Sequence, residues 1–288
     1  MLKMGIIGSE NSHTIAVAKI INVHKSVKGL TVTHVWGETE ELAKAAAEKG
    51  AIPTIVKRPG DMLGKVDGVM ADHRDGKYHA RAVRPFIQAG IPCFVDKPLT
   101  CSLAEARSLL ALARRKKTPV TSFSGIVLQS SVKGIRKELQ ALGALRVAHI
   151  VGPGDYNSKY HGIFFYGIHE ADLAIELFGI GATEVTASKN GGDCTAAVSY
   201  PAGFTVTLNF LVKGPGEWSV AAVGEKGSVM KAVVSDSDFY LPGVQAVMRM
   251  FKTGHVPFDD RRLLAPIALL EAIHKSLKTG KPAKVAQV

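Results

Sequence analysis

A six-residue polar turn near the start of the chain, Gly8-Ser9-Glu10-Asn11-Ser12-His13, follows a short apolar run and precedes a helical pattern. In dinucleotide-binding folds the backbone of such a strand–turn–helix holds a pyrophosphate. The usual pattern has three glycines, but here only Gly8 is present, with Glu10 and His13 in the other two places. Three polar side chains are candidate donors to phosphate: Ser9, Asn11 and Ser12. Because serine and asparagine also cap helices well, the alternative is that they only begin the helix.

A second candidate for nucleotide binding follows the next strand-like run, which ends Val35-Trp36-Gly37-Glu38. An acid at this point binds the adenosine ribose in Rossmann folds, so Glu38 is predicted to do so. The alternative is an acid in the first turn of a helix, where it favours the helix dipole. Glu40 and Glu41 follow with no arginine immediately there, which favours NAD and leaves NADP as the alternative cofactor.

The first half of the chain alternates strand and helix patterns. The strand-like runs are short and rich in Val and Ile, as in buried parallel strands: 4–7, 30–36, 66–70, 91–95 and 119–123. The helical patterns lie at 14–23, 38–49, 78–89 and 102–117. Such repeated β–α units predict a doubly wound parallel sheet, and therefore a Rossmann-type dinucleotide-binding domain over residues 1–123.

The second half has a different pattern. Helices are predicted at 131–142, 169–178, 244–252 and 266–278, and strands at 145–151, 184–189, 195–200, 204–211, 218–223 and 228–234. Turn signals at Pro201-Ala202-Gly203 and Glu225-Lys226-Gly227 join neighbouring strands as hairpins. We expect an α+β domain over residues 124–288, built on a mostly antiparallel, open-faced sheet. If strands 204–211 and 218–223 expose their apolar residues, this domain also mediates a homodimer or dimer-based oligomer.

The composition excludes several classes of protein. Among 288 residues with a net charge of +11, the basic residues are scattered and carry no nucleic-acid motif. No run approaches the roughly 20 apolar residues that span a membrane. The three cysteines, Cys93, Cys101 and Cys194, have no paired spacing. This indicates a reducing compartment. We therefore expect a cytoplasmic protein that binds neither nucleic acid nor membrane and holds no metal.

Four segments carry a resemblance to a known family. They are Asp96-Lys97-Pro98 after a strand, Gly167-Ile168-His169-Glu170-Ala171-Asp172, His79 after the fourth strand, and the tail Ala272–Pro282. Their order and spacing are similar to those of the glucose–fructose oxidoreductase/inositol dehydrogenase/MocA family, abbreviated Gfo/Idh/MocA. The resemblance covers nearly the whole chain. It implies NAD(P)-dependent hydride transfer at a hydroxyl or carbonyl of a sugar-like or polyol substrate.

The resemblance also implies roles for individual residues. Lys97 would hydrogen-bond the reacting hydroxyl and His169 would be the acid/base, which suits a group that titrates near neutral pH. The segment around Lys97 would also contact the cofactor, through His79, Asp96, Lys97 and Pro98. Substrate contacts are expected from Tyr156, Tyr160, His161, Tyr166 and Asp172. The alternatives are a solvated turn for Lys97, a core position for His169 and domain packing for the aromatic loop.

Three departures from the family pattern keep other functions open. Glu10 and His13 replace glycines, and Phe165 stands where the family often has an aspartate four residues before the histidine. One alternative is an enzyme of another class on the same fold, such as an eliminase or hydrolase that uses bound NAD. The other is a non-catalytic binding protein with a degenerate nucleotide site.

Overall fold

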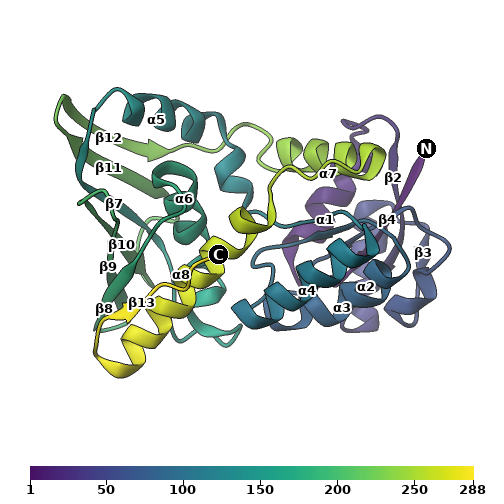
Figure 1. Cartoon of the computed structure of the whole chain (residues 1–288). Coiled ribbons are helices and arrows are strands. Elements are labelled where there is room, and N and C mark those ends of the chain that lie inside the picture. The colour runs from purple at the N-terminus through teal and green to yellow at the C-terminus, as the bar shows by residue number, and fades with distance from the viewer. The chain divides into compact units, whose positions relative to one another are not determined.

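The protein, represented by a computed structural model that describes all residues from Met1 to Val288, divides into two compact units (Figure 1). The first unit contains residues 1–100, 104–123 and 240–259, and the second contains residues 101–103, 124–239 and 260–288. Helix α7 (Leu241–Thr253) therefore belongs to the first unit although it comes late in the chain. The ring of Phe251 on this helix occupies the space above Gly68, where a Cβ would lie 2.4 Å from it.

The first unit is a parallel sheet with the strand order β3-β2-β1-β4-β5-β6. Its strands are β1 (Leu2–Ile7), β2 (Leu30–Trp36), β3 (Thr54–Ile55), β4 (Gly68–Ala71), β5 (Cys93–Val95) and β6 (Val120–Thr121). The order reverses between β1 and β4, and ligands of doubly wound sheets bind at the carboxyl ends of strands around such a point. The predicted fold class of this half is confirmed. Strand β3 was not predicted, because two exposed residues carry no periodicity.

Four helices connect these strands: α1 (Ser12–Ala18), α2 (Glu40–Gly50), α3 (His79–Gln88) and α4 (Leu103–Lys116). The helix predicted over 14–23 is confirmed, although it begins as α1 and continues as a π-helical turn over Lys19–Val23. In this turn the amide of Asn22 hydrogen-bonds the backbone of Val32 and Ala51 at 2.9 Å each. Asn22 thus ties the turn to strand β2 and to the end of α2.

The second unit is a seven-stranded sheet in the order β12-β11-β7-β10-β9-β8-β13. The strands are β7 (Leu145–Pro153), β8 (Glu184–Asn190), β9 (Asp193–Ser199), β10 (Thr205–Leu211), β11 (Trp218–Gly224), β12 (Gly227–Val233) and β13 (Ala283–Lys284). Only β7 and β10 pair in parallel, so the predicted mostly antiparallel sheet and both hairpins are confirmed.

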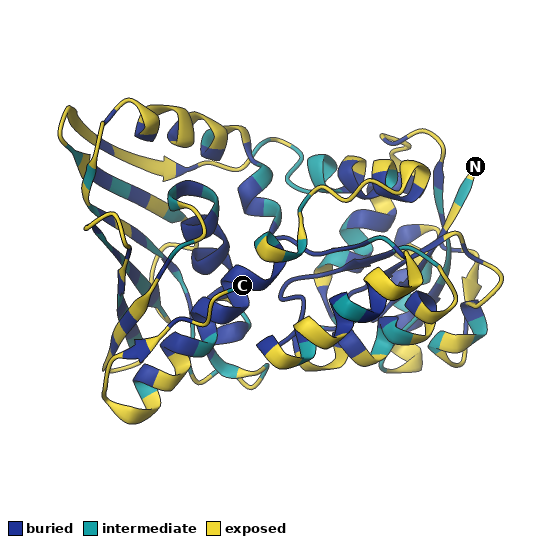
Figure 2. Cartoon of the chain, in the orientation of Figure 1, coloured by how far each residue is buried: buried dark blue, intermediate teal, exposed yellow.

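Three helices accompany this sheet: α5 (Ser130–Gln140), α6 (Ile168–Phe178) and α8 (Asp260–Thr279). Helix α6 is buried along almost its whole length (Figure 2). Helix α8 begins six residues before the predicted start at Pro266, since Asp260 supplies an acid to its first turn and the proline lies inside the helix. No helix of the protein is both long enough and apolar enough to cross a membrane.

The large apolar side chains of β10 point inward, contrary to the expectation from sequence. In β10, Val206, Leu208 and Phe210 are fully buried, while the alternate positions Thr205 and Thr207 are half-buried. The prediction that strand 204–211 exposes its apolar residues was therefore wrong, because the pleat turns them to the core. On β11 and β12 the outer face does expose apolar residues, since Val223 is 46% and Met230 83% exposed.

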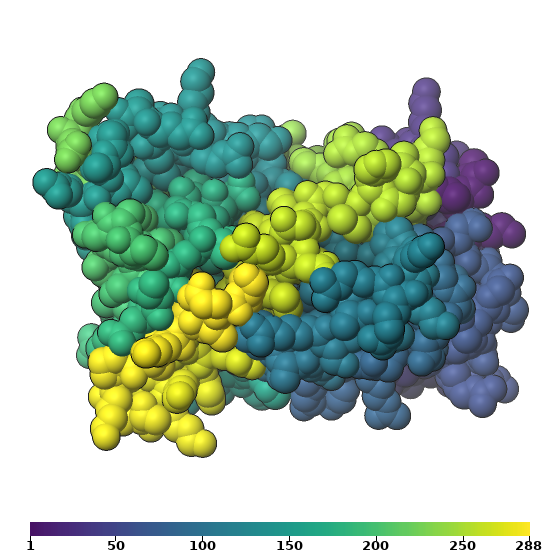
Figure 3. Space-filling view, viewed as in Figure 1, coloured from purple at the N-terminus to yellow at the C-terminus, as the bar shows by residue number.

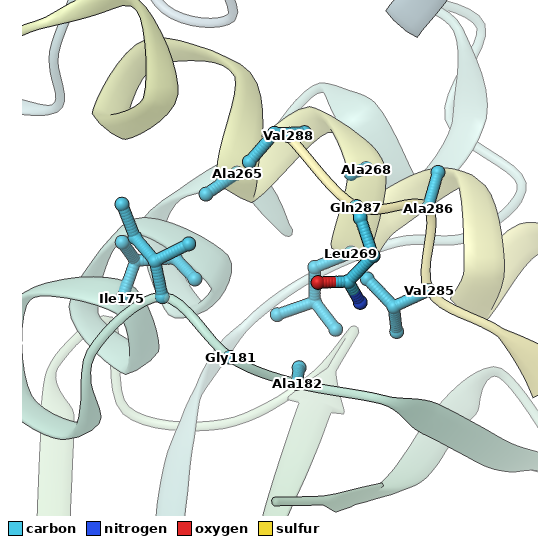
Figure 4. Close-up of a pocket in the computed structure, with 11 residues that line it drawn as sticks. Ile175, Gly181, Ala182, Ala265, Ala268, Leu269, Val285, Ala286, Gln287 and Val288 are labelled. Atoms are coloured by element: carbon cyan, nitrogen blue, oxygen red, sulfur yellow. The ribbon is translucent and has the colours of Figure 1, made fainter.

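The C-terminal residues lie on the surface of the second unit, as the yellow atoms in the space-filling view show (Figure 3). Beneath this tail is a cavity of about 20 Å³, lined by α8, the end of α6 and residues 285–288 (Figure 4). Its lining is largely apolar, with Ile175, Leu269 and Val285 among the contacts. A space of this size holds one water molecule at most, so it is not a substrate or cofactor site.

Candidate functional site

The turn after β1 has a backbone that only glycine can adopt. Gly8 has a φ of +108°, and a Cβ there would lie 2.7 Å from the backbone of Asp72 and His73. The next two amides, of Ser9 and Glu10, donate hydrogen bonds of 2.8 and 3.0 Å to one carboxylate oxygen, Oε2, of Glu38. The acid predicted to bind ribose is therefore fixed against the predicted phosphate turn.

Three buried polar atoms in this region have no hydrogen-bond partner: Ser9 Oγ, Glu38 Oε1 and His73 Nδ1. The His73 ring packs 5.7 Å from the ring of Trp36 and 5.8 Å from that of Tyr78, measured between centroids. Burial, with a contribution from His79, lowers the pKa of His73 to about 4, so the ring is neutral at neutral pH. Because buried polar groups are normally satisfied, these atoms fit a ligand that offers hydroxyls and a flat ring, as adenosine does.

The other predicted phosphate donors behave differently from one another. Asn11 precedes α1 but makes no capping bond; its Nδ2 donates to Asp72 Oδ1 at 2.9 Å and to Asp96 Oδ2 at 3.2 Å. Ser12 is exposed at the first position of the helix. The capping alternative is therefore wrong for Asn11, whose amide instead bridges two carboxyl groups.

These carboxyl groups belong to a buried cluster at the carboxyl ends of β4 and β5. His13 Nδ1 lies 3.0 Å from Asp96 Oδ1 and 4.0 Å from Asp72 Oδ1. Lys97 Nζ lies 3.9 Å from Asp96 Oδ2. Burial raises the pKa of Asp72, and the charge of Asp96 raises it further. Burial also opposes ionisation of Asp96, but the charges of His13 and Lys97 outweigh it and hold the pKa of Asp96 well below its ordinary value.

The segment that carries Lys97 is anchored through His79. The peptide bond between Lys97 and Pro98 is cis. His79 is fully buried, with Nδ1 2.7 Å from the carbonyl oxygen of Pro98 and Nε2 2.9 Å from that of His73. Both ring nitrogens face backbone carbonyls, and the neutral ring that the lowered pKa favours donates to one of them, so His79 anchors the backbone of this region.

His169 lies in the second unit, near the start of helix α6, and is 8% exposed. Its Nδ1 lies 2.7 Å from the hydroxyl of Ser124, whose backbone N–H donates to Asp172 Oδ2 at 2.8 Å. Asp172 Oδ1 accepts a very short hydrogen bond from Arg262. His169 is therefore oriented by a hydrogen-bonded chain that ends on a buried ion pair. The oxygens of Asp172 are occupied within the unit, which gives no support to its predicted substrate contact.

The aromatic loop before α6 holds the remaining predicted substrate residues. The Tyr156 hydroxyl donates to the carbonyl of Gly191 at 3.0 Å, so Tyr156 is tied to the β8–β9 hairpin. The ring of Phe165 packs 4.8 Å from that of Tyr160 and 5.0 Å from that of Tyr166. Tyr166 in turn packs 5.4 Å from His169. His161, the last of the set, is exposed and has a left-handed φ of 73°.

Four residues of these networks were not recognised as functional from sequence: His13, Asp72, Ser124 and Arg262. His13 and Asp72 had a usable signal, because Asp72 directly follows β4 and His13 lies in the first turn of α1, just after β1. Ser124 and Arg262 had none, since they lie 45 and 93 residues away from His169 along the chain. Lys97 belongs to the first unit and His169 to the second, and their joint action on one hydroxyl stays a prediction.

A comparison with protein families identifies the class of the first unit. Residues 2–123 match the model of the Gfo/Idh/MocA oxidoreductase family with an NAD-binding Rossmann fold. Over these residues the chain matches the nucleotide-binding domain of this family of oxidoreductases, which confirms there the resemblance seen in the sequence.

Individual proteins agree with this family. The chain is 25% identical over 203 residues to "Putative oxidoreductase YceM" of Salmonella typhimurium; the match spans 68% of this chain and 64% of that protein, less than two thirds of its length. Myo-inositol dehydrogenase from Lactobacillus casei, solved with NAD(H) and myo-inositol, is 17% identical with a TM-score of 0.84 over 100% of this chain and 98% of that one. Biliverdin reductase from Synechocystis, solved with biliverdin and NADP+, is 15% identical with a TM-score of 0.80 over 96% and 99%. At these identities the structures share the fold, which evidently serves different substrates.

Proposed function

We propose that this protein is an NAD(P)-dependent oxidoreductase that transfers hydride at a hydroxyl or carbonyl carbon of a polyol or sugar-like substrate. The observation that carries the proposal is the pair of buried, unpartnered atoms Ser9 Oγ and Glu38 Oε1 beside the glycine turn. A dinucleotide ribose would satisfy both, with Gly8 giving the backbone its close approach. The polyol dehydrogenase of the same fold supports the substrate class.

Glu38 favours NAD as the cofactor. Its carboxylate is held in place by two backbone amides, and its second oxygen is left to accept a hydrogen bond from a ribose hydroxyl. A 2′-phosphate in the same place would meet a negative charge. We therefore expect NAD(H) to bind more tightly than NADP(H).

The chemistry assigned to the chain's own residues is proton transfer and charge stabilisation. The nicotinamide, when bound, supplies or accepts the hydride. The Lys97 ammonium, buried beside Asp96, would donate to the reacting oxygen and stabilise the alkoxide that develops on it. His169, held at Nδ1 by Ser124, would take the hydroxyl proton during oxidation and return it during reduction. Tyr160, His161 and Tyr166 are the loop residues that we propose for substrate contact.

Two further proposals concern the oligomeric state and the cellular location of the protein. We propose that it forms a homodimer or a dimer-based oligomer through the outer face of the second sheet, where Val223 is 46% exposed among small residues. Light scattering at micromolar concentration tests this, and a monomer would count against it. All three cysteines are buried and none forms a disulfide, which supports a cytoplasmic location.

A substrate panel tests the activity directly. Purified protein is mixed with NAD+ or NADP+ and with inositols, open-chain polyols and aldoses, and the absorbance of the reduced cofactor is followed. We expect reduction of NAD+ with at least one polyol. Absence of turnover in both directions across the panel, together with tight NADH binding, would favour a non-catalytic binding protein.

A further inference from the structure

His13 occupies the place of a glycine in the nucleotide turn, and its side chain is largely buried. The imidazole is 18% exposed and lies 5.1 Å from the ring of Tyr240, measured between centroids. Its Nδ1 lies 3.0 Å from Asp96 Oδ1. The imidazole therefore fills space that a glycine would leave empty, and it contacts Asp96, the residue directly before Lys97.

The charge state of the cluster depends on where the single hydrogen of the Thr14 hydroxyl lies. The Thr14 hydroxyl contacts both the carbonyl oxygen of Gly8, at 2.8 Å, and Asp72 Oδ2 at a very short distance. A hydroxyl has one hydrogen to donate, and the Gly8 carbonyl can only accept. If Thr14 donates to Gly8, then Asp72 must donate to Thr14, which requires Asp72 to be a neutral carboxylic acid. Complete burial of Asp72 raises its pKa and agrees with this state.

The remaining charges are one carboxylate, Asp96, and two cations. Asp96 is acidic because of His13 and Lys97. Burial lowers the pKa of His13, whereas the charge of Asp96 and its hydrogen bond raise it, and the pKa lies above its ordinary value. The groups that face His13 are Asp96, Asp72, Lys97 and Tyr240. With His13 protonated and Asp72 neutral, the cluster has one net positive charge.

The distances show which cation Asp96 prefers. His13 approaches Asp96 to 3.0 Å, within hydrogen-bonding distance, whereas Lys97 stays at 3.9 Å, beyond it. We propose that His13 is a positioning residue of the nucleotide site: as an imidazolium it holds Asp96 through the hydrogen bond that Lys97 does not make, and it leaves the cluster of His13, Asp96 and Lys97 with one positive charge for a diphosphate. This inference rests on the proposed dinucleotide function.

Restoring the glycine decides between a helpful and an obstructive His13. NADH affinity is measured by calorimetry from mildly acidic to alkaline pH for the wild type, His13→Gly and His13→Gln, with His24→Gln as the control at an exposed histidine of the same unit. Wild-type affinity should fall as pH rises and His13 loses its proton. His13→Gly and His13→Gln should bind roughly tenfold more weakly at neutral pH, the scale of one partly buried charge, with a flat pH profile. Added imidazole should restore His13→Gly, and His24→Gln should match the wild type.

The opposite result has a clear meaning. If His13→Gly binds NADH as tightly as the wild type or more tightly, His13 obstructs a degenerate turn and the proposal is wrong. Should the wild type bind no NADH at any pH, the proposed function fails. A histidine NMR titration of the ligand-free protein still tests the clamp, which is the contact of the His13 imidazolium with Asp96. There the His13 signal should titrate above the ordinary range of a histidine and move to lower pH in Asp96→Asn. An unmoved His13 titration would contradict the clamp, and circular dichroism confirms that each variant is folded.

Discussion

Each unit buries one carboxyl group that meets a cation and another that does not. In the first unit Asp96 is held by the cations His13 and Lys97, while Asp72 lies beside it without a cation of its own. In the second unit Asp172 pairs with Arg262, while Glu170 on the same helix has no cation beside it. A buried carboxyl must either meet a cation or keep its proton. The comparison therefore separates charged, orienting acids from neutral ones.

Glu170 is the neutral acid of the second unit. It is fully buried, and burial raises its pKa well above the ordinary value against weaker opposition from its own backbone N–H and the indole of Trp218. Gly152 on β7 makes the room, since a Cβ there would lie 2.3 Å from Trp218 Nε1 and 2.8 Å from Glu170 Oε1. The Trp218 ring packs 5.1 Å from that of His169. Through the Trp218 ring, the neutral Glu170 thus supports the position of His169, the proposed acid/base.

The largest expected effect is on turnover, and it comes from removing Lys97, which lies beside Asp96, or His169, which is oriented through Ser124 and Asp172. Lys97→Ala should abolish turnover, because no other cation is placed to stabilise the alkoxide. His169→Ala should lower kcat by roughly 10²–10⁴, the usual worth of a positioned general base. Steady-state kinetics with NAD+ and a polyol measure both. Full activity in Lys97→Ala would remove that residue from the mechanism.

Breaking the charged pair of the second unit should cost stability. Arg262→Met leaves Asp172 buried without its cation, and the loss is expected to be about 3–5 kcal/mol. Arg136→Met is the matched control, because the Arg136 side chain is 55% exposed and its 2.8 Å pair with Glu176 should be worth at most about 1 kcal/mol. Urea unfolding compares the two variants. Equal losses would mean that the Asp172 pair is no stronger than a surface pair.

The next effect is on cofactor choice. Glu38→Ala removes the proposed acceptor for the ribose hydroxyl and the carboxylate that would repel a 2′-phosphate. The preference for NADH over NADPH should shrink by about 1–3 kcal/mol, the range for a charge-assisted hydrogen bond. Competitive titration of both nucleotides measures this. An unchanged ratio would return Glu38 to the alternative role of an acid beside a helix.

The smallest effect sharpens the contrast between the neutral acids and the charged ones. A carboxyl whose pKa is raised by folding stabilises the protein while protonated, so stability falls as pH rises from the unfolded-state pKa through the folded one. Glu170→Gln should therefore be less sensitive to alkaline pH than the wild type, as measured by melting temperature. Glu138→Gln, at an exposed acid, should follow the wild-type curve. A Glu170→Gln curve parallel to the wild type would mean that Glu170 is charged.

The fold of the first unit could be predicted because its signals are local. Each strand is a short run of Val and Ile, and each helix has a start or stop residue, such as Gly50 after α2 or Gly90 after α3. Residues that follow strands of a parallel sheet meet at one edge, so Gly8 and Glu38 were singled out by position, whereas Asp96 was singled out by the family resemblance. Short elements such as β3 were missed because two residues set no period.

The network around His169 could not be predicted, for a physical reason. Its members come from a loop, helix α6 and helix α8, and no periodicity links Ser124 or Arg262 to a histidine so distant in sequence. The exposure of β10 was predicted wrongly because the apolar residues of a strand do not indicate which face of the sheet is covered. The proton on Asp72 likewise cannot be read from the sequence, since it depends on the Thr14 hydroxyl meeting both the Gly8 carbonyl and the Asp72 carboxyl group.

The most direct test of the central claim is a calorimetric titration of the wild-type protein with NADH and, separately, with NADPH. The account predicts that NADH binds with one site per chain and more tightly than NADPH, because Ser9 and Glu38 offer unpartnered polar atoms to an unphosphorylated ribose. Heat of binding from neither nucleotide, at neutral or mildly acidic pH, would contradict the dinucleotide site on which the proposed function rests.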